Sequence, residues 1–227
     1  MRQRLAVLCV TVATLTGACS KAAEKPSDAG TAAKATTAAP ADRKYLLETV
    51  DDAAVVQYYA DGFDKLPLRE KTLVYHLYRA ALAGRDIFID QKHRNALEMR
   101  GVFEAILTHP QGVGPQTLSE IQRYAKLFWL NNGPYVSLTA RKFVLNLKPD
   151  VWADAAHKAV QAGASFPVQN GETVDALLTR LAPMFLDPAV DPIVTNKTPG
   201  PGRDILTSSA NNLYAGGVST GDLKGFT

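Results

Sequence analysis

Apolar residues recur at intervals of three and four along most of this chain, and that spacing constrains its fold more than any other feature. The stripes consist of Leu47, Val50, Ala54 and Tyr58; Leu73, Leu77, Ala80 and Ala81; Ala96, Met99, Phe103 and Ile106; Leu118, Ile121, Ala125 and Phe128; Trp152, Ala156 and Ala159; and Val174, Leu177, Leu178 and Leu181. Glycine or proline separates most of them, as at Gly62, Gly84, Pro110, Pro149 and Gly163. We therefore predict a mainly α-helical body over residues 42–185. Its core should include Leu73, Leu77, Phe103, Ile106, Ile121 and Phe128.

The segment "NNGPYVSLTARKFVLNL", residues 131–147, interrupts this helical pattern. Asn131, Asn132, Gly133 and Pro134 combine the residues that favour tight turns, and the residues after them are β-branched or aromatic in places. We predict a turn at Asn131–Tyr135 and short strands around residues 135–147. The turn is either purely structural or lies beside a binding cleft and contacts substrate.

Residues 186–227 are rich in loops, with four prolines between Asp187 and Pro201. A long irregular segment inside a compact domain suggests that other polypeptide packs over it. The closing residues "STGDLKGFT" predict the first turn of a helix, because Ser219 suits an N-cap and Asp222 suits a first turn. We expect this helix to be truncated, in a chain that is a piece of something longer; the alternative is a frayed tail.

No catalytic or metal site can be assigned from local spacing. The histidines are His76, His93, His109 and His157, and no two of them are four residues apart. The chain therefore contains no H-E-x-x-H zinc motif, and it has no G-x-S-x-G nucleophile motif either. We expect His93 and His157 to be solvated, because each lies next to a lysine.

The first 18 residues have the features of a bacterial lipoprotein signal peptide. Arg2 and Arg4 precede an uncharged apolar run, and small residues lead directly into Cys19. We expect cleavage before Cys19 and lipidation of its thiol; the alternative is an ordinary signal peptide with Cys19 incidental. The only other cysteine, Cys9, would be removed with the signal, so no disulfide is expected.

Residues 20–41 contain alanine, threonine, lysine, serine and proline but no large apolar residue. Such a composition predicts a disordered tether between Cys19 and the folded body. The chain carries a net charge of +3, with its charges interspersed, so nothing points to a nucleic-acid partner. We expect an exported lipoprotein anchored at the membrane, on the periplasmic face of the outer membrane if the cell has two membranes. The sequence does not indicate an oligomeric state.

Three stretches resemble the dipeptidyl-peptidase III family of zinc metallopeptidases, in particular its bacterial branch. They are residues 50–91, residues 128–147 and residues 197–226, and the resemblance runs from about Tyr45 to the end of the chain. Its most specific part is an Asn-x-Gly-x-Tyr-x-Ser pattern followed by Lys-Phe-Val. The matching residues are Asn131, Gly133, Tyr135, Ser137, Lys142, Phe143 and Val144.

The resemblance implies an N-terminal part of a mixed α+β enzyme with two lobes facing a cleft. It further implies that the full-length enzyme uses zinc to release dipeptides from the N-termini of peptide substrates. The family's zinc ligands and catalytic glutamate lie beyond residue 227, so no catalytic or metal residue is assigned and this chain alone should bind no zinc and be inactive. The alternative is a non-catalytic lipoprotein that serves as an interaction or scaffold module.

Overall fold

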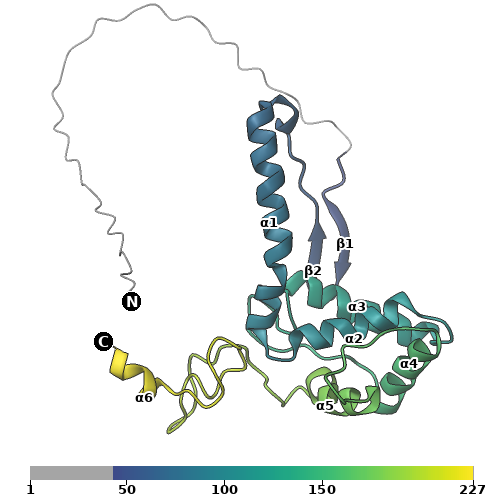
Figure 1. Ribbon diagram of the computed structural model, residues 1–227, viewed down its shortest axis with the longest axis vertical. Coiled ribbons are helices and arrows are strands. Elements are labelled where there is room, and N and C mark those ends of the chain that lie inside the picture. The colour runs from purple at the N-terminus through teal and green to yellow at the C-terminus, as the bar shows by residue number, and fades with distance from the viewer. Residues whose placement is uncertain (1–42, 227) are drawn as a thin grey trace, which may run out of the picture. The chain divides into compact units, whose positions relative to one another are not determined.

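The computed structural model describes residues 43–226; the predicted signal peptide, Cys19 and tether lie outside the described residues. The described part is mainly helical with one two-stranded antiparallel sheet, as expected in its coarse outline (Figure 1). Its elements are β1 (Leu46–Val50), β2 (Ala53–Val56), the 3₁₀ helix η1 (Phe63–Lys65), α1 (Leu68–Lys92), α2 (Ala96–Thr108), α3 (Pro115–Asn131), α4 (Pro149–Gln161), α5 (Val174–Leu186), α6 (Thr220–Leu223) and the 3₁₀ helix η2 (Lys224–Phe226).

The first elements form a β-hairpin where the spacing predicted a helix, so that prediction is wrong. Val50 pairs with Ala53 across a turn at Asp51, whose φ is 48°. β-branched residues on both sides of two aspartates favour strands and a turn over a helix. The hairpin is held against α3 by an ion pair between Arg123 and Asp51, with Nη1 and Oδ2 2.6 Å apart, and by another between Lys126 and Glu48.

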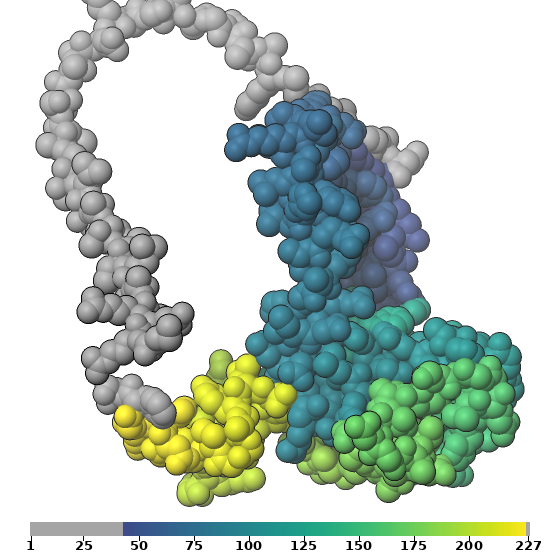
Figure 2. Space-filling view, in the orientation of Figure 1, coloured from purple at the N-terminus to yellow at the C-terminus, as the bar shows by residue number. Residues whose placement is uncertain are grey.

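Helix α1 is 25 residues long and continues through Gly84, where the sequence predicted a stop. A single interior glycine costs about 1 kcal/mol relative to alanine, which a helix of this length tolerates. Ile89 is its only buried residue, and Leu73 and Leu77 are 56% and 60% exposed, so placing them in the core was wrong. Figure 2 shows the solvent-exposed side of α1 in blue.

The core lies among α2, α3, α4 and α5, and there the predicted stripes are confirmed. Phe103, Ile106, Ile121 and Phe128 are all at most 2% exposed. Aromatic rings connect the helices: the centroids of Phe103 and Phe128 lie 5.1 Å apart, and edge-on contacts of this kind add to the burial energy. Trp152 from α4 and Phe185 from α5 extend the cluster on the other side.

Local chemistry fixes the helix boundaries. Pro115 and Pro149 occupy the first turns of α3 and α4, where a missing N–H has no consequence. The predicted start of the last helix is confirmed, because Ser219 and Asp222 form a reciprocal capping box at α6. None of the helices in residues 43–226 is long and apolar enough to cross a membrane.

The short strands predicted around residues 135–147 are not formed. This segment makes only isolated bridges, between Tyr135 and Lys142 and between Arg141 and Ile193. The tight turn between Tyr135 and Lys142, in which Ala140 has a φ of 59°, leaves too few residues for a β-ladder. The partner of Arg141 lies in the proline-rich loop, which is itself too irregular to extend the pairing.

Candidate functional site

The predicted turn at Asn131–Tyr135 is a tightly bonded helix end. The side chain of Asn131 donates from Nδ2 to the Leu127 carbonyl at 2.8 Å and accepts from the Ser137 N–H at 2.9 Å. Asn132 has a left-handed φ of 52° and ends α3. Both the nitrogen and the oxygen of the Asn131 amide group therefore make hydrogen bonds that stabilise the turn itself.

Gly133 brings this turn against the end of α1. Its φ is 145°, and a Cβ at this position would lie 2.9 Å from Cβ of Lys92. A side chain is therefore excluded by both backbone conformation and contact distance. The absence of a side chain at Gly133 lets the α3 turn and the α1 terminus pack directly on each other.

Tyr135 is fully buried, and its hydroxyl donates to the Asp191 carbonyl at 2.9 Å. Burial raises the pKa of this hydroxyl well above its usual range, so it stays protonated as a donor. In this structure the Tyr135 side chain serves as a fixed contact between the turn and the proline-rich loop. Asn131, Gly133 and Tyr135 are thus brought together, each with its contacts directed into the protein.

Short backbone pairings connect this turn to residues 190–212. The Lys142 N–H donates to the Pro192 carbonyl at 3.0 Å, and the Val194 N–H donates to Ala140 at 2.9 Å. From the other side, Ala210 and Asn211 donate to the carbonyls of Ile193 and Val194. These pairings form a three-segment framework, made of residues 135–142, 190–194 and 210–212.

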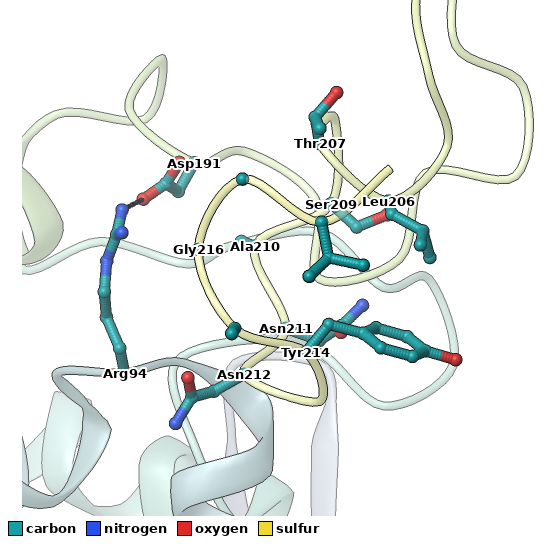
Figure 3. A pocket seen from close by; sticks show the side chains of 13 residues that line it. Arg94, Asp191, Leu206, Thr207, Ser209, Ala210, Asn211, Asn212, Tyr214 and Gly216 are labelled. Atoms are coloured by element: carbon teal, nitrogen blue, oxygen red, sulfur yellow. Dashed lines mark ion pairs between the residues drawn. The ribbon is translucent and has the colours of Figure 1, made fainter. Parts of the chain in front are cut away.

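The framework supports one wall of a cavity of about 310 Å³ (Figure 3). The cavity is lined by Arg94 and Asp191 and by residues of the loop that follows the proline-rich segment: Leu206, Thr207, Ser209, Ala210, Asn211, Asn212, Tyr214, Ala215, Gly216, Gly217 and Val218. Asn212 anchors the loop to α1, because its N–H donates to Gln91 at 3.0 Å and its amide contacts Asp90 at 3.3 Å.

The lining is rich in backbone donors. Within the described residues, the N–H groups of residues 213–217 donate no hydrogen bond, whereas the neighbouring Asn212 and Val218 both do. The side chain of Tyr214 is 47% exposed beside them. All five residues are solvent-exposed, and the N–H groups of Tyr214, Ala215, Gly216 and Gly217, which line the cavity, can donate hydrogen bonds to carbonyl or carboxylate oxygens of a ligand.

Two charges face this cavity. Arg94 Nη2 lies 3.9 Å from Asp191 Oδ2, and the Arg94 side chain is 71% exposed, so this ion pair is weak. Figure 3 shows the guanidinium directed toward Asp191 at the cavity edge. The Asp191 carboxylate has a second and shorter contact, with Nε2 of His93 at 3.0 Å.

His93 is 1% exposed, although its sequence neighbours predicted that it would be solvated. It follows the last residue of α1, and the same chain reversal that exposes Arg94 turns the imidazole inward against Tyr135, with ring centroids 6.5 Å apart. The sequence did not predict a site role for His93 or for Asp191. The two lie 98 residues apart, and no local pattern predicts contacts over such a separation.

Within residues 43–226, no three side chains of histidine, cysteine, aspartate or glutamate are grouped so that they could hold a metal ion. The described residues therefore do not fit the zinc that the resemblance implies for the whole enzyme. His157 is paired with Asp175 on the surface, and His76 contacts the ring of Tyr75.

Comparison with known protein families found no family model that matches this chain, and comparison with curated proteins found no match either.

Proposed function

We propose that this chain is the N-terminal part of an exported zinc metallopeptidase of the dipeptidyl-peptidase III kind, and that it supplies one wall of the peptide-binding cleft. In the resembling family, zinc and a glutamate base supply the hydrolytic chemistry, and both would come from polypeptide that follows residue 227. The residues that line the cavity would bind and orient the peptide.

The cavity wall at residues 214–217 is the observation that carries this proposal. An extended peptide presents backbone carbonyls at regular intervals, and the N–H groups of residues 214–217, which have no partner within the described residues, can donate hydrogen bonds to them. Such binding depends on the backbone of the ligand and little on its side chains. It therefore suits an enzyme that acts on many short peptides.

Helix α1 supports the view that the chain belongs to a larger fold. Nine large apolar side chains of α1 are exposed in the described structure: Leu68, Leu73, Val74, Tyr75, Leu77, Tyr78, Leu82, Ile87 and Phe88. They lie on several sides of the helix, and so much exposed apolar surface is typical of a site that contacts other polypeptide. In the proposed enzyme, further polypeptide covers this surface, whereas in the alternative scaffold module a partner protein covers it.

The proposal predicts weak binding of short peptides to the isolated chain. We expect a tetra-alanine peptide, titrated into a ¹⁵N-labelled sample, to shift the amide resonances of residues 214–217, with a dissociation constant in roughly the millimolar range. The amides of α4, which lie outside the cavity lining, are the internal control. Unchanged resonances at residues 214–217 at the highest peptide concentration would contradict the proposal.

The proposal also predicts that the isolated chain is inactive when zinc is added. A dipeptidyl chromogenic substrate should show no turnover above a metal-free control, because the described residues contain no ligand set. The genomic sequence downstream separates the two functions. A continued or frameshifted reading frame with a His-Glu zinc motif supports the enzyme, and an intact stop codon supports the scaffold module.

A further inference from the structure

Four separate parts of the chain meet at His93. They are the end of α1, the turn after α3, the loop around Asp191 and the start of α2 at Asn95, whereas Asn212 contacts α1 nearby, at Asp90 and Gln91. His93 is the most buried of the polar residues at this junction, and it is the only polar or charged residue among those described that is classed as buried.

The hydrogen bonds define which ring nitrogen carries the proton. The Asn95 N–H donates to Nδ1 of His93 at 3.1 Å, so Nδ1 is an acceptor and carries no proton. The proton of the neutral ring therefore resides on Nε2, which donates to Oδ2 of Asp191 at 3.0 Å. Both nitrogens are satisfied only in this tautomer, and a second proton on Nδ1 would meet the Asn95 N–H directly.

Asp191 transmits this contact to the cavity. It has a left-handed φ of 43°, which is unfavourable for a residue with a side chain, and it is held by His93 through its carboxylate and by Tyr135 through its carbonyl. The residues that follow it carry the pairings of the framework to Ala210 and Asn211. Without the imidazole contact, the backbone at Asp191 has one fewer restraint holding a strained conformation.

We propose that His93 is a positioning residue, which holds Asp191 and thereby the framework wall of the cavity while its ring is neutral. A second proton on Nδ1 leaves the Nε2–H bond to Asp191 possible but turns the contact with the Asn95 N–H into a repulsion, so that acidification displaces the ring from its buried site, loosens the wall and weakens ligand binding there. The ligand part of this inference rests on the proposed peptide function. The control of the cavity wall by His93 is independent of the proposed peptide function.

The charges around His93 determine the direction of the pH effect. Burial lowers the pKa of His93 below the usual value, the Asp191 carboxylate opposes this, and Arg94 and Lys142 add to it. Tyr135 stays neutral, because its own pKa is raised. In the unfolded chain His93 binds a proton more readily, so its contribution to stability is complete above about pH 6.5 and is lost as the pH falls toward the folded pKa.

Hydrogen exchange in the full chain without peptide tests the positioning role. Between about pH 7.5 and about pH 5, we expect protection of the Val194, Ala210 and Asn211 amides to fall after correction for intrinsic rates, because His93 binds a proton more readily once its site opens. The core amides of α2 should keep their protection. Equal protection of the wall amides at the two pH values would overturn the inference.

Two variants separate His93 from other titrating groups. In His93→Gln the side-chain amide can still donate to Asp191 but does not titrate, so the wall should stay protected at both pH values. The control His157→Gln removes a half-exposed histidine paired with Asp175 and should keep the wild-type pH response. If His93→Gln retained the wild-type fall in protection, His93 would not be the controlling group.

Two further measurements keep the test independent of how the variants fold. Long-range ¹H–¹⁵N spectra of the wild-type chain at about pH 7.5 should show the His93 proton on Nε2, and a proton on Nδ1 would overturn the inference. Tetra-alanine affinity should fall together with wall protection. Equal affinity at both pH values would refute the positioning role but leave the peptide proposal intact, whereas pH-dependent protection without any peptide binding would refute only the peptide proposal.

Discussion

At the scale of single residues, the hydroxyl of Tyr124 is the clearest imperfection of the core. The ring is fully buried against Phe103, Phe143 and Phe185, and the hydroxyl has no hydrogen-bond partner in the described structure. Burial raises the pKa of Tyr124 well above its usual range, so the group stays neutral. A buried hydroxyl without a partner lowers stability by roughly 1–3 kcal/mol.

Replacing this hydroxyl should therefore stabilise the protein. We expect Tyr124→Phe to raise the free energy of unfolding by about 1 kcal/mol, because it removes the desolvated group and leaves the ring contacts in place. Urea denaturation followed by circular dichroism measures the difference. Phe103→Ala is the comparison, since it creates a cavity in the same aromatic cluster and should lower the free energy of unfolding by about 3–5 kcal/mol. A destabilised Tyr124→Phe would show that the hydroxyl has a partner, such as an ordered water.

His93 shows what residue-level sequence reasoning misses. Its neighbours Lys92 and Arg94 are charged, so the local pattern favours solvent exposure. The chain reverses direction between α1 and α2, and the extended φ of −166° at His93 turns its ring away from those neighbours. Only the position of Asp191, fixed by the packing of distant segments, makes a buried site for it.

At the scale of elements, sequence periodicity worked where a helix buries one face. The bounds of α2, α3, α4 and α5 follow from their stripes and from the prolines and glycines beside them. The hairpin was missed because Leu47, Val50, Ala54 and Tyr58 also fit a helical spacing, and four residues cannot distinguish the two periods. The two aspartates at the turn, Asp51 and Asp52, indicate a hairpin more strongly than the apolar spacing indicates a helix.

Helix α1 gives a prediction at this scale. A Leu73→Lys, Leu77→Glu double variant should change the free energy of unfolding by less than about 0.5 kcal/mol, since both side chains are more than half exposed. The same variant should self-associate less, because it replaces two exposed apolar side chains of α1 with charged ones. Sedimentation velocity in a Cys19→Ser background, which removes any lipid, measures the association.

The matched control for α1 is Ile106→Glu, which places a charge at a fully buried position of α2. It should unfold the core, in contrast to the α1 double variant. A large loss of stability in the double variant would mean that the solvent-facing side of α1 carries contacts that its exposure does not reveal.

At the scale of the whole molecule, the mainly helical class follows from the sequence, and the two-lobed enzyme remains a proposal. The cavity could not be predicted, because Arg94, Asp191 and Asn212 contribute to it from segments with no shared motif. The loop-rich composition after Phe185 indicated only that the segment was irregular. What gives it a defined path is a set of single hydrogen bonds to α1 and to the turn after α3.

Anchoring of the whole molecule is a prediction that belongs to residues outside the described structure. We expect Cys19 to be the lipidated N-terminus of the mature protein, with the folded body held at the membrane by residues 20–41. Several acyl chains together give stable attachment, whereas one chain is marginal. After expression in a bacterial host, the wild type should fractionate with membranes and carry the acyl mass, and Cys19→Ser should not. A soluble, unacylated wild type would rule out the anchor.

The long separations in sequence at the cavity have a kinetic consequence. The contact between His93 and Asp191 closes a loop of 98 residues, and that between Asp90 and Asn212 closes one of 122, whereas α2, α3, α4 and α5 follow one another closely along the chain. Closing longer loops costs more chain entropy, so contacts between neighbouring helices are made sooner. The helical core should therefore assemble before the cavity wall. The cavity wall should form only after the chain has emerged from the ribosome as far as Asn212. A nascent chain stalled before that point would be folded in its core and still unable to bind at the cavity.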